Sequence, residues 1–360
     1  MKKVAGIVLV GLGVIGLLVT LPLAFFVWRM SGVLDSDEGW VVIIYCFGLP
    51  ILAAVSILVG WTLRREEPIQ PPEDNARDVT QLSCLGRGKG AMISIIVPVL
   101  NEAPQIRPFL RHLRARAPAA EIIVVDGGSS DATVSLATGY CDALLTRQSG
   151  RASQMNAGAR IASGQVLWFV HVDCETPSQA ANAITRVVAD QGFVGGCFRV
   201  CIPDSKPIYR VHDSWAHWIG KVLRVRCGDH GIFCTRSAFD RVGGYRDVPL
   251  MEDVEFVRAL HRLGRFEWLP ERLLLSKRRH EQVGPYRYTF VCSAIVGLYC
   301  AGVGSELLAK IYARMVRDRS REARILQPVE TSLFSKYRDE VQGPNNQPVE
   351  PTSLRAVNRV

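Results

Sequence analysis

The sequence lacks the cysteine pattern of a zinc-binding or disulfide-linked protein. None of its ten cysteines forms a CxxC pair. Cys197 and Cys201 are four positions apart, Cys227 and Cys234 are seven apart, and neither pair has a second half-site. We therefore predict reduced, mostly buried thiols that pack as small apolar groups.

The chain also lacks internal repeats and any signature of nucleic-acid binding, so its net charge of +9 over 360 residues does not indicate an RNA- or DNA-binding protein. A basic chain can also favour an anionic membrane surface or phosphorylated substrates. The densest basic cluster follows an apolar stretch, and it suits either a solvated helix face or a membrane surface. It contains Arg314, Arg317, Arg319, Arg321 and Arg324.

Charge is missing from two long segments near the start, residues 4–28 and 40–63. Each is long enough for a bilayer, which needs about 20 apolar residues. The first is too long for a signal-peptide core, and no small-residue cleavage site follows it. Lysines before the first segment and arginines after the second place both ends in the cytoplasm. We predict a multi-pass inner-membrane protein with a cytoplasmic catalytic domain.

Five regions follow from these patterns. Residues 1–65 are the predicted transmembrane hairpin, and residues 66–91 are a polar, proline-containing linker. Residues 92–284 are the catalytic domain. Residues 285–325 are an amphipathic or membrane-associated helix with the basic cluster, and a third membrane span there is a minor alternative. The tail, residues 326–360, has the composition of a disordered segment.

Within the catalytic region, apolar strands alternate with helical patterns. This alternation predicts an α/β fold, with a mostly parallel sheet and helices on both faces. The expected strands are residues 93–98, 121–125, 143–145, 165–172, 193–202 and 231–234. The expected helices are residues 106–113, 152–161, 209–223 and 252–263.

Acidic residues stand where several of these elements begin or end. Asp126 and Asp173 each follow a buried strand, and Glu252 and Asp253 precede a helical pattern. Ligands of open α/β sheets bind at the carboxyl ends of strands. We therefore predict a metal–nucleotide site with a separate general base.

Six motifs occur in order and together resemble family 2 glycosyltransferases with the GT-A (Rossmann-like) fold. They are Val97-Pro-Val-Leu-Asn-Glu102, Val125-Asp-Gly-Gly-Ser-Ser-Asp131, Gly150-Arg-Ala-Ser-Gln-Met-Asn-Ala-Gly158, His171-Val-Asp173, Gly228-Asp-His-Gly-Ile-Phe233 and Met251-Glu-Asp253. The third and fifth resemble a bacterial subgroup of transferases associated with radical-SAM/selenodomain proteins. The resemblance covers roughly half of the chain.

The resemblance implies a nucleotide-diphosphate-sugar donor, a divalent metal (Mn²⁺ or Mg²⁺) and inversion at the anomeric carbon. Asp173 matches the last carboxylate of the family's DxD motif and is expected at the metal, but His171 replaces the first one. Asp126 matches the acid that binds the nucleotide base. Further donor contacts are expected from Pro98, Asn101, Glu102, Arg151 and Asn156, with a helix-start charge for Glu102 and a surface position for Arg151 as the alternatives.

Asp253 matches the second acid of the family's ED motif and is expected to be the general base, with Glu252 orienting the acceptor. The alternative is that both are favourable charges at a helix N-terminus. Asp229 and His230 are expected on the acceptor side, although His230 also suits a plain buried histidine. His280 is a second metal candidate, with a solvated basic cluster as its alternative.

We therefore predict a membrane-anchored inverting glycosyltransferase. Its partners are a nucleotide-sugar donor, a small-molecule or lipid-linked hydroxyl acceptor and the membrane, without nucleic acid. Two alternatives stay open. One is a catalytically degenerate membrane scaffold, which His171 in place of an acid allows. The other is a sugar-phosphate nucleotidyltransferase, which would need a glycine-rich basic signature after the first strand.

Overall fold

The computed structural model describes residues 80–83, 92–147, 150–190, 192–223, 225–300 and 302–316. The chain divides into two compact units, residues 1–319 and 320–360, and the second lies outside the described residues. The predicted hairpin at residues 1–65, most of the predicted linker and the predicted tail lie outside them as well.

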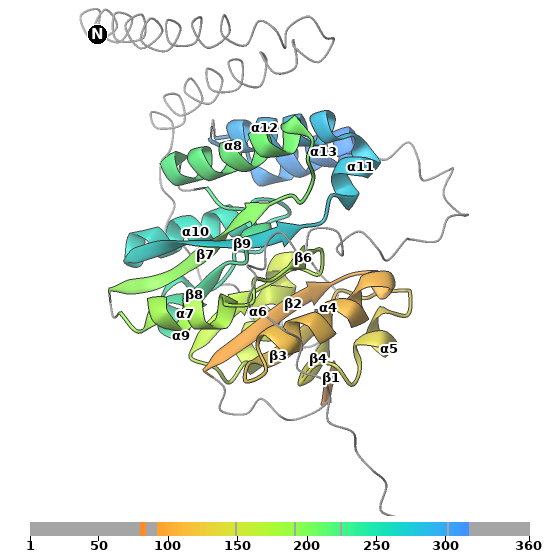
Figure 1. Ribbon diagram of the computed structural model, residues 1–360, viewed down its shortest axis with the longest axis vertical. Coiled ribbons are helices and arrows are strands. Elements are labelled where there is room, and N and C mark those ends of the chain that lie inside the picture. The colour runs from red at the N-terminus through yellow and green to blue at the C-terminus, as the bar shows by residue number, and fades with distance from the viewer. Residues whose placement is uncertain are drawn as a thin grey trace, which may run out of the picture. The chain divides into compact units, whose positions relative to one another are not determined.

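The described part of the chain contains one sheet of nine strands, in the order β1-β4-β3-β2-β5-β8-β7-β9-β6 (Figure 1). The strands are β1 (Thr80–Ser83), β2 (Ile93–Val99), β3 (Glu121–Asp126), β4 (Ala143–Thr146), β5 (Val166–Phe169), β6 (Cys174–Glu175), β7 (Phe193–Cys201), β8 (Phe233–Thr235) and β9 (Arg265–Leu275).

The prediction of an α/β fold is confirmed, but the prediction of a mostly parallel sheet is wrong. Strands β4, β3, β2 and β5 are parallel to one another, and β7 is parallel to β9. The pairings β1–β4, β5–β8, β7–β8 and β6–β9 are antiparallel. Local apolar periodicity identifies a strand but carries no information on its direction relative to its neighbours, so β8 could not be oriented from the sequence.

Helices cover both faces of this sheet. They are α4 (Ala103–Arg116), α5 (Thr133–Ala137), α6 (Arg151–Ile161), α7 (Ala180–Val188), α8 (Pro207–Leu223), α9 (Arg236–Val242), α10 (Glu252–Leu263), α11 (Arg278–Val283), α12 (Pro285–Cys300) and α13 (Ser305–Val316), with a 3-10 turn, η3 (Gly228–His230). Helices α8, α11, α12 and α13 lie together beyond β7 and β9 (Figure 1).

The two faces arise from strand alternation, because successive side chains of a strand point to opposite sides of the sheet. Ile95 and Val97 of β2 join the apolar cluster under α4 and α7. Ile96, between them, joins the second cluster, under α6, α9 and α10. A strand buried on both faces is apolar at nearly every position, as β2 and β3 are.

The parallel strands end at one edge of the sheet, and the predicted motifs follow them there. Val99 of β2 lies opposite Asp126 of β3 in the register. The Gln154 side chain of α6 ties the two strand ends together, because its amide nitrogen donates to the carbonyl oxygens of Val99 (2.9 Å) and Val125 (2.8 Å). This edge is where ligands of open α/β sheets bind.

A third apolar cluster joins α12 and α13 to the catalytic region. Val291 and Ile295 of α12 and Leu308 of α13 pack with Val225 and Met251. The predicted boundary at residue 284 therefore does not separate independent cores, because α12 completes the environment of the loop before α10.

The localisation predicted from the sequence needs correction. Among residues 80–83 and the described stretches from 92 to 316, no helix combines the length and the apolar character that a bilayer crossing requires. This includes α12, the site of the possible third span. The prediction of a multi-pass membrane protein with a cytoplasmic catalytic domain is contradicted by this finding, and the hairpin on which it depended lies outside the described residues.

Candidate active site

A cavity of about 780 Å³ lies at the carboxyl edge of the parallel strands. Its volume is in the usual range for small-molecule sites, about 300–1,000 Å³. Nine of the predicted site residues line it: Pro98, Glu102, Arg151, Asp173, Asp229, His230, Glu252, Asp253 and His280. Asn101, Asp126 and Asn156 are not among its lining residues. The tertiary structure thus brings together residues that are up to 182 positions apart in the chain, Pro98 and His280.

The Glu252–Asp253 pair begins α10 after a sharp backbone turn. Met251, the residue before the helix, has φ 70°, which is uncommon for a residue other than glycine. Met251 is buried at this conformation by the α12 cluster. Backbone strain of this kind is concentrated at functional sites, where surrounding packing maintains it. Here it places both carboxylates in the first turn of α10 and at the cavity wall.

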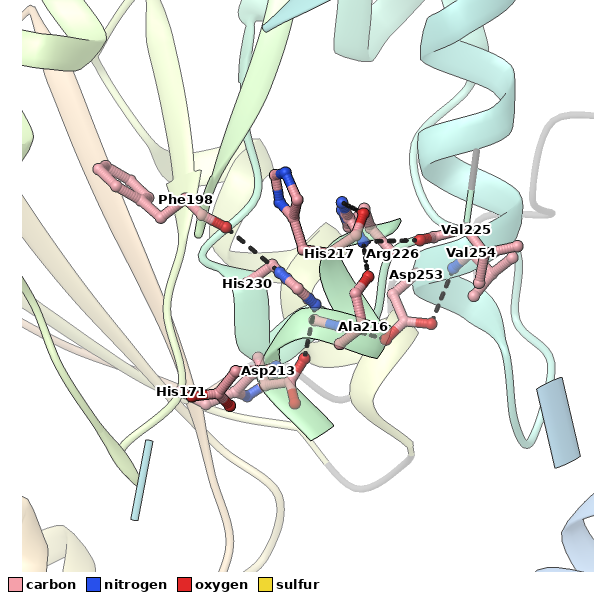
Figure 2. Close-up of polar contacts among 12 residues, drawn as sticks. His171, Phe198, Asp213, Ala216, His217, Val225, Arg226, His230, Asp253 and Val254 are labelled. Carbon is pink, nitrogen blue, oxygen red and sulfur yellow. Dashed lines mark hydrogen bonds and ion pairs between the residues drawn. The ribbon is translucent and has the colours of Figure 1, made fainter. Parts of the chain in front are cut away.

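Asp253 is 5% exposed, and both of its oxygens accept backbone hydrogen bonds. Oδ1 accepts from the Val254 N–H at 2.8 Å (Figure 2). Oδ2 accepts from the Gly228 N–H of η3. Burial raises the pKa of Asp253, against the opposing effect of the nearby Arg151 guanidinium. The carboxylate is therefore fixed in orientation and more basic than a solvated aspartate, as a general base requires.

Arg151, at the N-terminus of α6, connects three of the predicted motifs. Its Nε lies 3.3 Å from Glu252 Oε1, and its Nη2 lies 3.9 Å from Asp253 Oδ2. The same Nη2 is 2.9 Å from His171 Nε2. Since a guanidinium can only donate, the Nε2 atom of His171 accepts and its proton is on Nδ1. Arg151 was predicted to contact the donor; in the structure it pairs with the carboxylates of Glu252 and Asp253.

His171 is neutral in this arrangement. Burial and the Arg151 charge lower the pKa of His171 to about 3. A neutral imidazole that accepts from Arg151 does not supply the negative charge of the acid that the family motif has at this position. It instead links Arg151 to the strand end that carries Asp173.

Asp173 lies at the same cavity wall, beside a cation that the sequence pattern did not single out. The Arg279 Nε is 3.9 Å from Asp173 Oδ2. Burial acts in the opposite direction, but Arg279 holds the pKa of Asp173 below its ordinary value. Burial and the charge of Asp173 raise the pKa of Asp229, whose buried Oδ1 has no hydrogen-bond partner. The charges of the two carboxylates therefore repel each other.

Glu252 gives the site a testable pH dependence. Burial and the neighbouring Asp253 raise the pKa of Glu252 from 4.5 to about 7. Between these pH values Glu252 is protonated in the folded chain and ionised in the unfolded chain. The stability that this proton contributes is therefore present below pH 4.5 and is lost as the pH rises through about 7.

We therefore expect Glu252→Gln to become more stable relative to the wild type as the pH rises from mildly acidic to mildly alkaline, by about 1–3 kcal/mol over the range. Urea unfolding of both proteins at several pH values measures this difference. Glu306→Gln, at an exposed position of α13, serves as the control and should show no such trend. A wild-type-minus-variant difference that is constant with pH would contradict the expectation.

The expected nucleotide end of the cavity is formed by the ends of β2 and β3. Pro98 and Glu102 line it. The Glu102 carboxylate is held by both nitrogens of Arg278, at 2.9 and 3.1 Å. This forked pair joins the turn between β2 and α4 to α11. If Glu102 also bound the nucleotide sugar, one carboxylate oxygen would have to accept from both the sugar nucleotide and Arg278.

Asp126 and Asn101 stabilise loops in this region. Asp126 is 1% exposed, and its oxygens accept from the N–H groups of Gly128 and Ser129 (both 2.9 Å) and from the Ser129 hydroxyl (2.5 Å). Asn101, at φ 55°, joins the two turns: its N–H donates to Ser129 Oγ and its Oδ1 accepts from the Ser130 N–H. Neither side chain lines the cavity, so their predicted donor contacts have no geometric support.

Asn156 is likewise engaged inside the fold. Its Nδ2 donates to the Tyr245 carbonyl oxygen (2.7 Å), and its Oδ1 accepts from the Tyr245 N–H (2.8 Å). These two bonds fix the turn between α9 and α10. The prediction that Asn156 contacts the donor is not supported by this placement.

On the acceptor side, His230 is a buried structural histidine. Its Nδ1 is 3.2 Å from the carbonyl oxygen of Phe198 in β7, and burial lowers its pKa well below the usual value (Figure 2). Behind it lies Arg226, which is 2% exposed, donates to the carbonyl oxygen of Ala216 and stacks 3.2 Å from the Trp268 ring centroid. These contacts fix η3 and thus the Gly228 N–H that binds Asp253.

His280 is enclosed by aromatic rings. Its ring centroid is 4.6 Å from that of Tyr288, 5.4 Å from His212 and 5.5 Å from Tyr209. Burial lowers the pKa of His280 to about 3. No group of three or more potential metal ligands is present among the described residues. The weak assignment of His280 to a metal therefore finds no cluster of ligands around it, and the solvated alternative does not hold because His280 is buried.

Sequence reasoning missed the roles of Gln154, Arg226 and Arg279. Arg279 stands in the basic run Lys277-Arg278-Arg279 before His280, and that run was its one signal in the sequence. Gln154 and Arg226 had no local signal, because their partners are backbone carbonyls of other elements.

Comparison with known proteins agrees with the motifs. Residues 94–242 match the family model "Glycosyl transferase family 2". The glycosyltransferase AglE of Haloferax volcanii is 28% identical over 137 residues, which are 35% of this chain and 45% of AglE. The undecaprenyl-phosphate 4-deoxy-4-formamido-L-arabinose transferase of Sodalis glossinidius is 29% identical over 161 residues, 41% of this chain and 49% of that protein. The chain thus spans about half the length of these two relatives.

Among solved structures, the mannosyltransferase PcManGT of Pyrobaculum calidifontis, in complex with GDP-Man and Mn²⁺, aligns with a TM-score of 0.47 and 18% identity. The alignment covers 79% of this chain and 87% of that chain. The radical-SAM-associated subgroup does not emerge from these comparisons and stays a prediction. The broader prediction of a glycosyltransferase is confirmed at the level of the domain, since residues 94–242 match the Glycosyl transferase family 2 model.

Proposed function

We propose that this protein is a GT-A-type inverting glycosyltransferase that moves a sugar from a nucleotide-diphosphate sugar to an acceptor hydroxyl, with Asp253 as the general base. The observation that carries the proposal is the buried Asp253 carboxylate at the cavity wall, oriented by two backbone N–H groups beside Arg151. The matched family domain and the relatives named as sugar transferases support the reaction class.

In this proposal the acceptor oxygen attacks the anomeric carbon while Asp253 takes its proton, and the bond from that carbon to the nucleoside diphosphate breaks. The hydrogen bonds from Gly228 and Val254 hold the carboxylate in place, so it need not reorganise during proton transfer. Glu252, with its pKa near 7, can donate or accept a hydrogen bond at neutral pH and so can orient the acceptor.

The residues present fit a divalent metal that is held jointly with the donor. Asp173 and Asp229 supply hard carboxylate oxygens, and the buried Asp229 Oδ1 has no hydrogen-bond partner. Mg²⁺ and similar ions are commonly bound by one or two carboxylates together with substrate phosphates and water. When bound, such an ion would neutralise the charge on the diphosphate leaving group. Asp173 and Asp229 would hold it, and Arg279 would add positive charge at the same wall.

Asp173→Ala tests this assignment. We expect it to weaken metal-dependent binding of a nucleotide-sugar by about 10- to 100-fold, the loss of one charge-assisted contact of about 1.5–3 kcal/mol. Calorimetric titration of UDP- and GDP-sugars, with Mn²⁺ and with a chelator, measures the effect without turnover. Asp190→Ala removes an aspartate with a half-exposed side chain that is paired with Arg265, and it should leave the affinity unchanged. Equal metal-dependent affinity in Asp173→Ala and the wild type would contradict the assignment.

The function itself is tested by incubating the purified full-length chain with Mn²⁺ and a panel of nucleotide sugars, and by measuring release of the nucleoside diphosphate. The proposal expects release with at least one donor. A protein that binds none of the donors and releases no diphosphate would be better explained as a degenerate scaffold.

A further inference from the structure

The Gln154 side chain of α6 lies at the nucleotide end of the cavity, and its amide has a fixed orientation. Its Nε2 donates to the carbonyl oxygens of Val99 (2.9 Å) and Val125 (2.8 Å), at the ends of β2 and β3. A carbonyl oxygen can only accept, so the amide nitrogen must face both strand ends. An amide turned the other way would bring three oxygens together without a hydrogen between them. The position of Oε1 is therefore determined as well.

The Oε1 atom of Gln154 is left as an acceptor that faces a ligand site. Gln154 is 5% exposed and lines the cavity. The described residues donate no hydrogen bond to Oε1, and this oxygen is not completely enclosed by the protein. Polar groups in such buried positions are nearly always paired, because an unpaired one costs free energy. A ligand in the cavity that carries an N–H group would supply the missing donor.

The cavity wall around Gln154 suits the flat, partly apolar ring of a nucleobase. Leu100 follows β2 and Gly127 follows β3, and both line the cavity. The Leu100 side chain is large, apolar and 54% exposed. A Cβ added at Gly127 would lie 3.1 Å from Gln154 Nε2 and 3.3 Å from the Val99 carbonyl oxygen. The absence of a side chain at Gly127 therefore leaves the amide undisturbed, and the wall offers one apolar side chain beside one fixed acceptor.

The acid that the sequence resemblance assigns to the base is occupied elsewhere. Asp126 does not line the cavity, and its carboxylate accepts from the N–H groups of Gly128 and Ser129 in its own loop. An acceptor for the base must therefore come from another residue. Gln154 provides one at the same strand ends, from the helix instead of the loop.

We propose that Gln154 Oε1 selects the nucleobase of the donor by accepting a hydrogen bond from its ring N–H, so that the donor carries uracil, thymine or guanine and not cytosine or adenine. The inference rests on the proposed function and adds the class of nucleotide and the residue that selects it. Uracil, thymine and guanine have a hydrogen on the ring nitrogen of their pairing edge. Cytosine and adenine have a lone pair there, which a fixed acceptor repels. A site built to bind an N–H group discriminates strongly against an analogue that lacks it.

The test uses two pairs of nucleotides of matched size, UDP with CDP and GDP with ADP. Each is titrated calorimetrically into the full-length wild type with Mn²⁺. We expect UDP or GDP to bind most tightly and its partner to bind about 5- to 100-fold more weakly, because the buried acceptor then stays unpaired. Methylation of the ring nitrogen, in 3-methyl-UDP or 1-methyl-GDP, should cause a loss of the same order. These measurements need no variant, so they decide the question even if a substitution at Gln154 disturbs the fold.

Gln154→Lys removes the acceptor, while its ammonium group can still donate to the carbonyl oxygens of Val99 and Val125. The preference for a ring N–H should fall to parity or reverse, because an ammonium group can donate to the lone pair of cytosine or adenine. Gln179→Lys is the matched control. Gln179 is an exposed glutamine outside the cavity whose amide oxygen accepts from Asn182, and its substitution should leave the preference as in the wild type.

Three outcomes are decisive against the inference. Wild-type binding of CDP or ADP that equals or exceeds the binding of UDP and GDP would overturn it, and so would an unchanged preference in Gln154→Lys. In both cases the proposed function stands if the protein still releases a nucleoside diphosphate from a nucleotide sugar. Failure of the wild type to bind any of the four nucleotides and to release a diphosphate would remove the proposed function, and the base selection with it.

Discussion

Asp253→Asn is expected to lower sugar transfer by about 10²–10⁴-fold, the usual contribution of a positioned general base. The amide has nearly the same shape as the carboxylate but cannot take a proton from the acceptor. Nucleotide-sugar binding should stay close to the wild type, because the donor does not depend on this proton transfer. Steady-state transfer and calorimetric donor binding, measured on the same preparations, separate the two effects.

The substitution also has a structural cost that the experiment must control. Both Asp253 oxygens accept backbone N–H groups, from Gly228 and Val254. Asparagine can satisfy one of them, and its NH₂ group then faces the other donor, so we expect destabilisation of about 1–3 kcal/mol. Asp253→Ala with added formate is therefore a useful second test, since formate can replace the missing base. Asp190→Asn, which removes the charge of an exposed aspartate outside the cavity, should leave transfer unchanged.

Normal transfer by Asp253→Asn would refute the base assignment. A loss of transfer accompanied by an equal loss of donor binding, without rescue of Asp253→Ala by formate, would instead identify Asp253 as a residue that holds the site together. The alternative from the sequence, a simple helix N-terminal charge, predicts near-normal transfer, with a stability change of about 0.3–1 kcal/mol.

The second large effect is expected from Gly228→Ala, which adds one methyl group. A Cβ at this position would lie 2.6 Å from His171 Nε2 and 2.7 Å from Arg151 Nη2. The Gly228 backbone is not in the left-handed region, so alanine itself adopts it without strain. The fold can therefore accommodate the methyl group only by shifting the His171 ring and the flexible end of Arg151.

Moving Arg151 breaks its contacts with Glu252, Asp253 and His171, and these contacts hold the three side chains together. A displacement of about 1 Å in such a site can cost about 10²-fold in rate, so we expect kcat to fall by that order while the Tm changes little. Gly297→Ala is the matched control, a cavity-lining glycine with open space around an added Cβ, and should transfer normally. Wild-type kcat in Gly228→Ala would show that the Arg151 arrangement is dispensable.

Several local features followed directly from sequence patterns. The helical spacing at residues 252–263 gave the observed bounds of α10, and the apolar stretches at residues 93–98 and 121–125 gave β2 and β3 to within one residue. These predictions work because the spacing of apolar residues within a short stretch of sequence largely decides whether it forms a helix or a strand. The in-order motifs also located the carboxylates that line the cavity, because strand ends of an α/β sheet meet at one edge.

The partner of each polar side chain was not predictable in this way. Asp126 and Asp173 look alike in sequence, as acids after buried strands. In the structure Asp126 closes its own loop with Ser129, whereas Asp173 faces the cavity beside Arg279. Arg151 pairs with the ED carboxylates because α6 and α10 pack on the same face of the sheet. Which carboxylate meets a cation is decided by contacts between elements, which no local pattern encodes.

The amino-acid sequence by itself thus determined the α/β class, the extents of the main strands and helices and the identity of the candidate acids, since these depend on short-range periodicity and motif order. Only the tertiary structure decided the mixed direction of the sheet, the closure of Asp126 and Asn156 within the fold, and the orientation of the Gln154 amide. The physical reason is that hydrogen-bond partners, burial and the resulting pKa shifts arise where segments distant in sequence come into contact.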